Sequence, residues 1–101
     1  MAEWRCKTGD YHRQIALELS DMTTSGATGV TFRMRLASGG ALVVNAAGAI
    51  ESSSKIRYQF TGTQLDTAGH YLLEATLTYP DGQETAPSSG QVDVIIESRL
   101  S

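Results

Sequence analysis

The chain alternates apolar and polar residues along most of its length. The clearest row is residues 30–36, in which four apolar side chains alternate with three polar ones. A period of two places successive side chains on opposite faces of a β-strand, and the spacings of three and four that mark an amphipathic helix are absent. Similar rows predict further strands at residues 4–7, 14–19, 42–44, 49–51, 55–60 and 71–79, and a final strand that begins near residue 83, is interrupted at residues 86–90 and resumes to residue 96.

Turn signals separate these rows. Ser38-Gly39-Gly40 and Pro80-Asp81-Gly82 are combinations typical of tight turns between strands. We therefore predict an all-β fold, an immunoglobulin-like antiparallel β-sandwich of about seven to eight strands. At 101 residues the chain is expected to form a single domain over residues 1–101, with its core at about residues 4–97.

The inward members of the rows form the predicted core. They are Ile15, Leu17, Leu19, Val30, Phe32, Met34, Leu36, Ile56, Tyr58, Phe60, Tyr71, Leu73, Leu77, Val92, Val94 and Ile96.

Residues 66–71, Asp-Thr-Ala-Gly-His-Tyr, form a turn that leads into the longest row. Tyr71 is the first inward residue of that row, and its hydroxyl can reach the backbone of the preceding turn, as in the tyrosine corner of immunoglobulin-like sandwiches. Asp66 is expected to accept backbone N–H bonds there, and Gly69 to supply a conformation that other residues avoid. Because Leu73 stands where antibody domains have a cysteine, apolar packing replaces the disulfide between the sheets. The corner predicts a fold and not a reaction.

Charge and cysteine content limit the classes of partner and compartment. The formal net charge of −3 argues against a protein that binds nucleic acid. Cys6 is the only cysteine, which excludes an intrachain disulfide. The N-terminal residues have no signal-peptide pattern, and no apolar run is long enough to cross a bilayer. We expect synthesis in a reducing cytoplasm and no association with a membrane.

Residues suited to catalysis or metal binding are sparse. His12 and His70 lie far apart, and together with one cysteine they match no zinc spacing. Asp10, Asp66 and Asp81 lie in turns without the dense carboxylate spacing of a calcium loop. No serine stands in a nucleophile-elbow pattern. We therefore predict no enzyme activity, no cofactor and no metal.

Two features of the predicted surface have alternative interpretations. Arg33 and Arg35 project outward from one strand, beside Glu74 on the expected neighbour. They either form cross-strand ion pairs on a solvated face or bind carboxylates of a partner. Trp4, near one end of the chain, lies either at an interface or under the sandwich.

Several short segments carry a resemblance through their order and spacing. They are Gly9-Asp10, residues 26–35, Ile56-Arg57-Tyr58, residues 66–71, and Tyr79-Pro80-Asp81-Gly82 with the following Pro87. Over residues 9–97 the chain resembles the immunoglobulin-like N-terminal domain of tailed-bacteriophage baseplate upper proteins. In that family the domain is a structural module of the virion that attaches receptor-binding or fibre parts within symmetric assemblies.

The resemblance implies a non-enzymatic virion structural protein of the tail, baseplate or capsid. Such a protein is made in the bacterial host cytoplasm, is present in multiple copies or as a homo-oligomer, and contacts other phage virion proteins. We expect no helical or fibre-forming extension, so a stand-alone accessory module is predicted. The alternative is a carbohydrate-binding host-surface adhesion module. That alternative predicts an exposed aromatic cluster, whereas the aromatic residues here fall mostly on inward positions.

Overall fold

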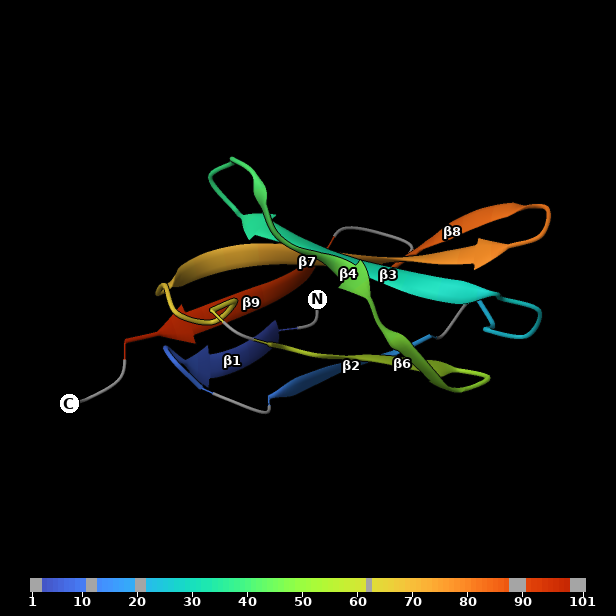
Figure 1. Ribbon diagram of the computed structural model, residues 1–101, viewed down its shortest axis with the longest axis horizontal. Coiled ribbons are helices and arrows are strands. Elements are labelled where there is room, and N and C mark those ends of the chain that lie inside the picture. Colours follow the sequence, from blue (N-terminus) through green and yellow to red (C-terminus); the bar gives the residue numbers. More distant parts are fainter. Residues whose placement is uncertain (1–2, 11–12, 20–21, 62, 88–90, 99–101) are drawn as a thin grey trace.

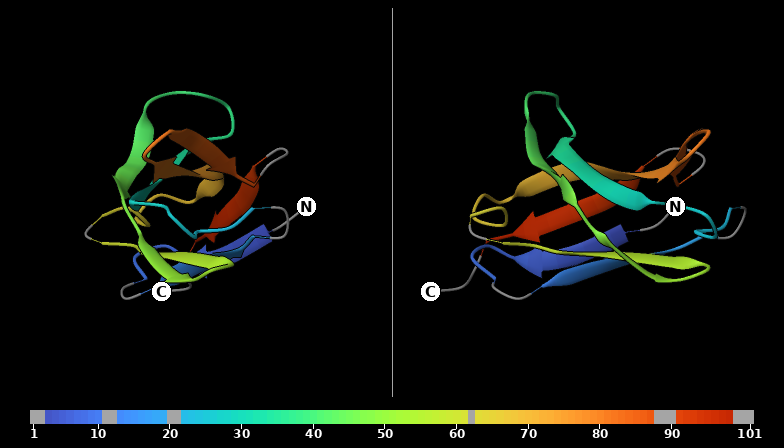
Figure 2. Two further views of the ribbon diagram at one scale, coloured as in Figure 1. Left: turned by 90° about the vertical axis from the view of Figure 1, so that its right-hand side faces the viewer. Right: turned by 45° about the vertical axis from the view of Figure 1, so that its right-hand side comes forward.

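The computed structural model describes residues 3–10, 13–19, 22–61, 63–87 and 91–98. Nine strands in these residues form two sheets that pack face to face (Figure 1). The two layers are seen from the end and obliquely in Figure 2. None of the described residues is helical, and so none belongs to a helix able to span a bilayer. The predicted all-β sandwich is confirmed.

The larger sheet has six strands. Their order is β1 (Glu3–Lys7), β9 (Val92–Glu97), β7 (Gly69–Tyr79), β3 (Gly29–Leu36) and β4 (Leu42–Ala47), and β8 (Gly82–Ala86) also pairs with β7. The smaller sheet has the order β2 (Gln14–Glu18), β6 (Lys55–Gln59) and β5 (Ala49–Ser52).

The strand count exceeds the predicted seven to eight because the interrupted C-terminal row forms two strands, β8 and β9. The rows at residues 42–44 and 49–51 form β4 and β5, one in each sheet. Both β8 and β9 pair with β7, so the chain does not change sheets at this interruption. One pairing also departs from the antiparallel prediction, because β1 runs parallel to β9, with Glu3 opposite Asp93.

Gly48 carries the chain from the larger sheet to the smaller one. It lies between β4 and β5, and its N–H donates to the carbonyl of Val30 at 2.9 Å. In Figure 1 this green segment descends from the upper layer to the lower one. A Cβ at this position would lie 2.4 Å from Cε1 of Phe32 and 2.7 Å from the carbonyl oxygen of Arg57. The crossing therefore has no room for any side chain.

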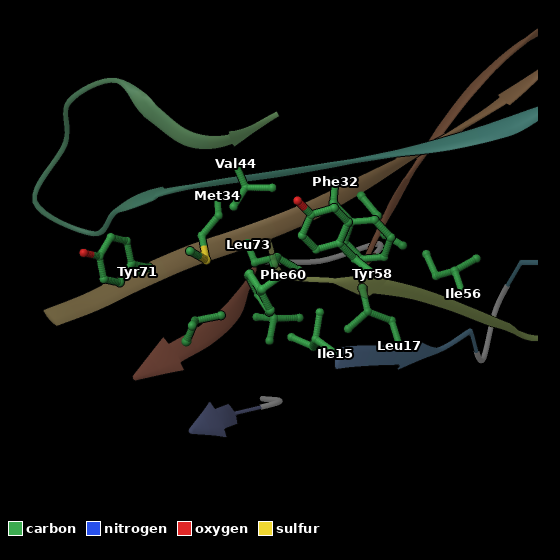
Figure 3. Close-up of a cluster of buried hydrophobic side chains, with 14 of the residues drawn as sticks. Ile15, Leu17, Phe32, Met34, Val44, Ile56, Tyr58, Phe60, Tyr71 and Leu73 are labelled. Carbon is green, nitrogen blue, oxygen red and sulfur yellow. The ribbon is translucent and has the colours of Figure 1, made fainter. Parts of the chain in front are cut away.

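The core fills the space between the sheets, and Figure 3 shows a part of it. Phe32 from the larger sheet meets Tyr58 from the smaller one, with ring centroids 5.5 Å apart. Tyr58 in turn packs edge-on against Phe60 at 5.2 Å. Each such ring contact adds about 0.5–1.5 kcal/mol to the stabilisation by burial of apolar area.

Every predicted core residue is buried except Leu36. Leu36 is the last residue of β3 and keeps 38 % of its surface exposed. Five further buried hydrophobic side chains are not among the predicted core residues, and they are Cys6, Val44, Leu65, Ala75 and Ala86.

Candidate functional site

Tyr71 closes the turn before β7. Its side chain is 3 % exposed, and its hydroxyl donates to the carbonyl of Thr67 at 2.9 Å. This is the geometry that the tyrosine-corner prediction describes. Burial raises the pKa of the Tyr71 hydroxyl, because the charged phenolate is poorly solvated there. The contacts are all within the fold, so the corner organises the sandwich and offers no group to a ligand.

The other two residues of the predicted corner behave differently from each other. Gly69 has a φ of 155°, and a Cβ there would lie 3.3 Å from Cδ2 of Leu36. Both the backbone and the neighbouring side chain therefore favour glycine. Asp66 is exposed, and its backbone N–H donates to the carbonyl of Thr63 at 3.2 Å. Its carboxylate makes no hydrogen bond with the described residues, in contrast to the prediction that it would bind turn amides.

The outer face of the six-stranded sheet displays the two predicted arginines. Both are exposed, because the residues that alternate with them on β3 turn into the core. Arg33 is opposite Glu74 of β7, and Arg35 is opposite Leu72 of the same strand. The sequence therefore placed the arginines on the correct face and beside the correct strand.

The expected ion pair between Arg33 and Glu74 does not form. Nη1 of Arg33 instead donates to the hydroxyl of Thr76 at 2.7 Å. The carboxylate of Glu74 accepts a bond from Nε2 of Gln91 at 2.9 Å. Arg35 makes no hydrogen bond or ion pair with the described residues. Neither guanidinium is therefore neutralised by a carboxylate in the described part of the chain.

A hollow of about 220 Å³ lies between these side chains, and we call it the arginine hollow. It is lined by Arg33, Arg35, Leu42, Leu72, Glu74 and Gln91. Its walls come from three strands and the residue before β9, so the fold creates it and no single segment does. A guanidinium presents a rigid fork of donors that matches a carboxylate, and two such groups beside apolar side chains suit an acidic group on a protein partner.

Exposed apolar side chains extend the arginine hollow to the sheet edge. Leu42 and Val43 of β4 are 43 % and 42 % exposed, and β4 has no partner among the described strands on its outer side. The pairing of β3 with β4 shifts register between Met34, which is opposite Val44, and Arg35, which is opposite Leu42. This shift brings Leu42 beside Arg35. An apolar patch bordered by arginines is the composition found at the centres of protein interfaces.

The sequence contains one further signal for the arginine hollow besides the two arginines. Leu72 occupies an outward position of β7, where a polar residue is expected, because Tyr71 and Leu73 on either side of it are buried. Gln91 and Leu42 could not have been assigned to this site from the pattern, because only the sheet order brings them beside Arg33 and Arg35.

Trp4 packs against the core of the sandwich. It is half-buried, stacks on Phe60 with ring centroids 5.2 Å apart, and is covered by the guanidinium of Arg13 at 5.3 Å. A cation over an indole ring stabilises by about 0.5–1 kcal/mol at exposed sites. Trp4 therefore packs against the sandwich, and its role at an interface stays a prediction.

The described residues contain little material for catalysis. Nε2 of His70 lies 2.8 Å from Oδ1 of Asp93 on the exposed face of the sheet, without a nucleophile in contact. Cys6 is buried, and this burial is the main reason that the pKa of its thiol is raised. The carboxylate of Asp10 also raises this pKa, and the guanidinium of Arg13 lowers it. No group of three or more metal-ligating side chains occurs in the described ranges. His12 lies outside the described residues.

A shallow groove of about 460 Å³ lies at the opposite end of β7. Met22, Tyr79, Asp81, Gln83 and Glu84 are among the residues that line it. The Tyr79 hydroxyl donates to the carbonyl of Thr23, which fixes the ring at the groove wall. An aromatic ring with a few polar groups beside it is the composition of many small-molecule sites.

Comparison with known proteins adds no assignment: no protein-family model matches the chain, and no curated protein is significantly similar to it. The geometry of these surfaces is therefore the observation from which a function can be proposed.

Proposed function

We propose that this domain is a non-enzymatic structural protein of a bacteriophage particle, in which it joins neighbouring virion proteins through the arginine hollow. The observation that carries the proposal is the pair of exposed guanidinium groups, Arg33 and Arg35, that have no carboxylate partner among the described residues. The segments that resemble phage baseplate domains supply the biological setting. The partner is a virion protein that presents an acidic side chain or a terminal carboxylate.

The arrangement of the arginine hollow explains why an external carboxylate would be favoured. Arg33 already donates to Thr76, which holds its guanidinium near the sheet, while Glu74 is occupied by Gln91. An incoming carboxylate therefore displaces no internal ion pair, and it meets two cations that outweigh the one negative charge of Glu74. Leu42 and Leu72 beside them exclude water from one side of the contact. Truncation of one partner in a buried charged pair at an interface typically costs about 2–5 kcal/mol.

Multiple copies in a symmetric particle would add to a weak single contact. When many copies bind a repeated lattice, each further contact is intramolecular and avidity exceeds the affinity of one site. Six residues line the arginine hollow, whereas a stable interface involves about 20–30 residues on each side. We therefore propose an accessory protein in the tail, baseplate or capsid, present in many copies.

Incorporation into particles tests the proposal. The Arg33→Glu/Arg35→Glu double variant should fold normally and should be lost from purified particles. The control is Lys55→Gln/Arg57→Gln, which removes two cations at the same spacing on β6 of the other sheet without placing new carboxylates beside Glu18 and Glu51. The ion pairs that it removes are exposed and contribute little, so it should fold and incorporate. Immunogold labelling of infected-cell membranes with none on virions would exclude the proposal.

A second candidate function is adhesion to host-surface carbohydrate, and the groove beside Tyr79 is the observation that favours it. Binding to a glycan array that is lost with Tyr79→Ala, and kept by the double arginine variant, would support this function in place of the first. The Tyr79→Phe variant is the control, because it keeps the ring face and removes only the hydroxyl bond to Thr23.

A further inference from the structure

One edge of the smaller sheet is open. β2 pairs with β6 on one side, and no described strand pairs with its other side. Strand edges in native proteins are usually protected by charges, proline or bulges. β1, at the neighbouring edge of the larger sheet, carries Arg5 and Lys7 paired with Glu97. β2 carries a single charged residue, Glu18, and pairs with β6 without a bulge.

The hydrogen-bond register shows which backbone groups face outward along this edge. The N–H of Leu19 donates to the carbonyl of Ser54, and the N–H of Phe60 donates to the carbonyl of Arg13. In an antiparallel pair the residues alternate between bonding the neighbour and pointing away from it. The odd-numbered residues of this strand therefore bond β6. The N–H and C=O groups of Gln14, Ala16 and Glu18 point to the open side.

An apolar groove of about 320 Å³ runs beside the same edge. Residues 16–19 form one side, and Ala86 and Pro87 at the end of β8, with Val92 at the start of β9, form the other. The groove therefore lies between the open edge of the smaller sheet and the larger sheet. A strand placed about 4.8 Å from β2 would direct every second side chain into it.

We propose that the open edge of β2 and this groove form a docking site for an extended segment of another protein, which adds as a strand to β2. The row of backbone donors and acceptors selects an extended backbone, and the groove selects apolar side chains at alternate positions. This proposal goes beyond the function proposed above and uses the opposite sheet from the arginine hollow, so either can fail alone.

The charge on β2 defines the partner segment further. The side chain of Glu18 is 72 % exposed, and its contact with Lys55 is long, with 3.8 Å between Nζ and Oε1. Opposite charges directly across a strand pair are favourable, and like charges are not. The segment is therefore apolar at every second position and carries Lys or Arg opposite Glu18.

Selection from a library of short random peptides tests the site. The full-length chain is immobilised, peptides that bind are enriched, and their sequences are compared. The expected peptides alternate Val, Ile or Leu with polar residues and carry a basic residue at one position. Addition of an enriched peptide to the free protein should slow amide exchange at Gln14, Ala16 and Glu18. A failure to enrich any peptide, or enrichment of helical spacing, would overturn the proposal.

The decisive variant is Ala16→Pro. It removes an N–H that no described strand uses, so the ladder with β6 stays intact and the protein should remain folded. The Kd of the enriched peptide should rise at least about tenfold, because one bond is lost and the ring blocks the edge. The Arg33→Glu/Arg35→Glu variant is the control and should bind the peptide unchanged. Equal binding of the peptide to the Ala16→Pro variant and the wild type would refute strand addition.

Glu18→Lys provides a test that does not depend on a proline in a strand. The side chain at position 18 is exposed, so the variant should fold normally. In the peptide selection, the residue enriched opposite position 18 should change from basic to acidic. An unchanged preference would refute the proposed placement of the segment. If the chain alone forms dimers that Ala16→Pro abolishes, the occupant is a second copy, and the assignment to another protein is wrong.

Discussion

The crossing between the sheets at Gly48 gives the sharpest prediction about the fold. A Cβ at position 48 would lie 2.4 Å from Cε1 and 2.5 Å from Cδ1 of Phe32, and 2.7 Å from the carbonyl oxygen of Arg57. Carbon atoms in ordinary contact are about 3.5–4.0 Å apart, so each distance is about 1 Å too short. Phe32 is fully buried against Tyr58, and Arg57 belongs to a paired strand. Neither can yield without moving the core or the sheet.

Gly48→Ala should therefore lower the free energy of unfolding by about 2–3 kcal/mol, the upper part of the usual range for overpacked cores. For a domain of this size that corresponds to a fall in Tm of about 10–20 °C. Urea unfolding with an unchanged m-value measures it. The matched control is Gly29→Ala, because a Cβ at Gly29 meets nothing within 4 Å. A Gly48→Ala protein within about 0.5 kcal/mol of the wild type would refute the steric explanation of this glycine.

Three further predictions concern buried groups. Tyr71→Phe should lower the free energy of unfolding in urea by about 1 kcal/mol, because it removes the bond that the buried tyrosine donates to the carbonyl of Thr67. Tyr79→Phe should lower it by less than about 0.5 kcal/mol, because the bond to Thr23 lies at the exposed surface. Because burial raises the pKa of Tyr71, its contribution is present below about pH 10 and is lost as the pH rises through the raised pKa. Unfolding measured at several alkaline pH values should show a smaller loss of stability for Tyr71→Phe than for the wild type. Cys6 should react with iodoacetamide slowly in the folded protein and rapidly in denaturant, and equal rates would contradict its burial and raised pKa.

The sequence predicted the elements and faces of the fold well, because a strand with one buried face has a direct signature in its period of two. The residues from Val30 to Met34 and from Val92 to Ile96 are buried in alternation as the pattern required. Leu65 and Ala86 were missed for opposite reasons. Leu65 is buried from a loop that has no period, and Ala86 is small enough to be buried without standing out in the pattern.

The pairing of strands was less accessible than their positions. Nothing in the row that contains Trp4 and Cys6 distinguishes the observed parallel pairing with β9 from an antiparallel one. The arginine hollow shows the same limit. Arg33 and Arg35 were predicted from their spacing, but the choice of Thr76 over Glu74 as the partner of Arg33 depends on side-chain positions across the sheet.

The proposed role can be observed in a cryo-electron microscopy reconstruction of the intact particle at a resolution that shows side chains. We expect the sandwich in multiple copies, with a carboxylate of a neighbouring virion protein within hydrogen-bond distance of the guanidinium groups of Arg33 and Arg35. Particles that lack the domain, or that hold it with these arginines facing solvent, would show that the arginine hollow does not join virion proteins.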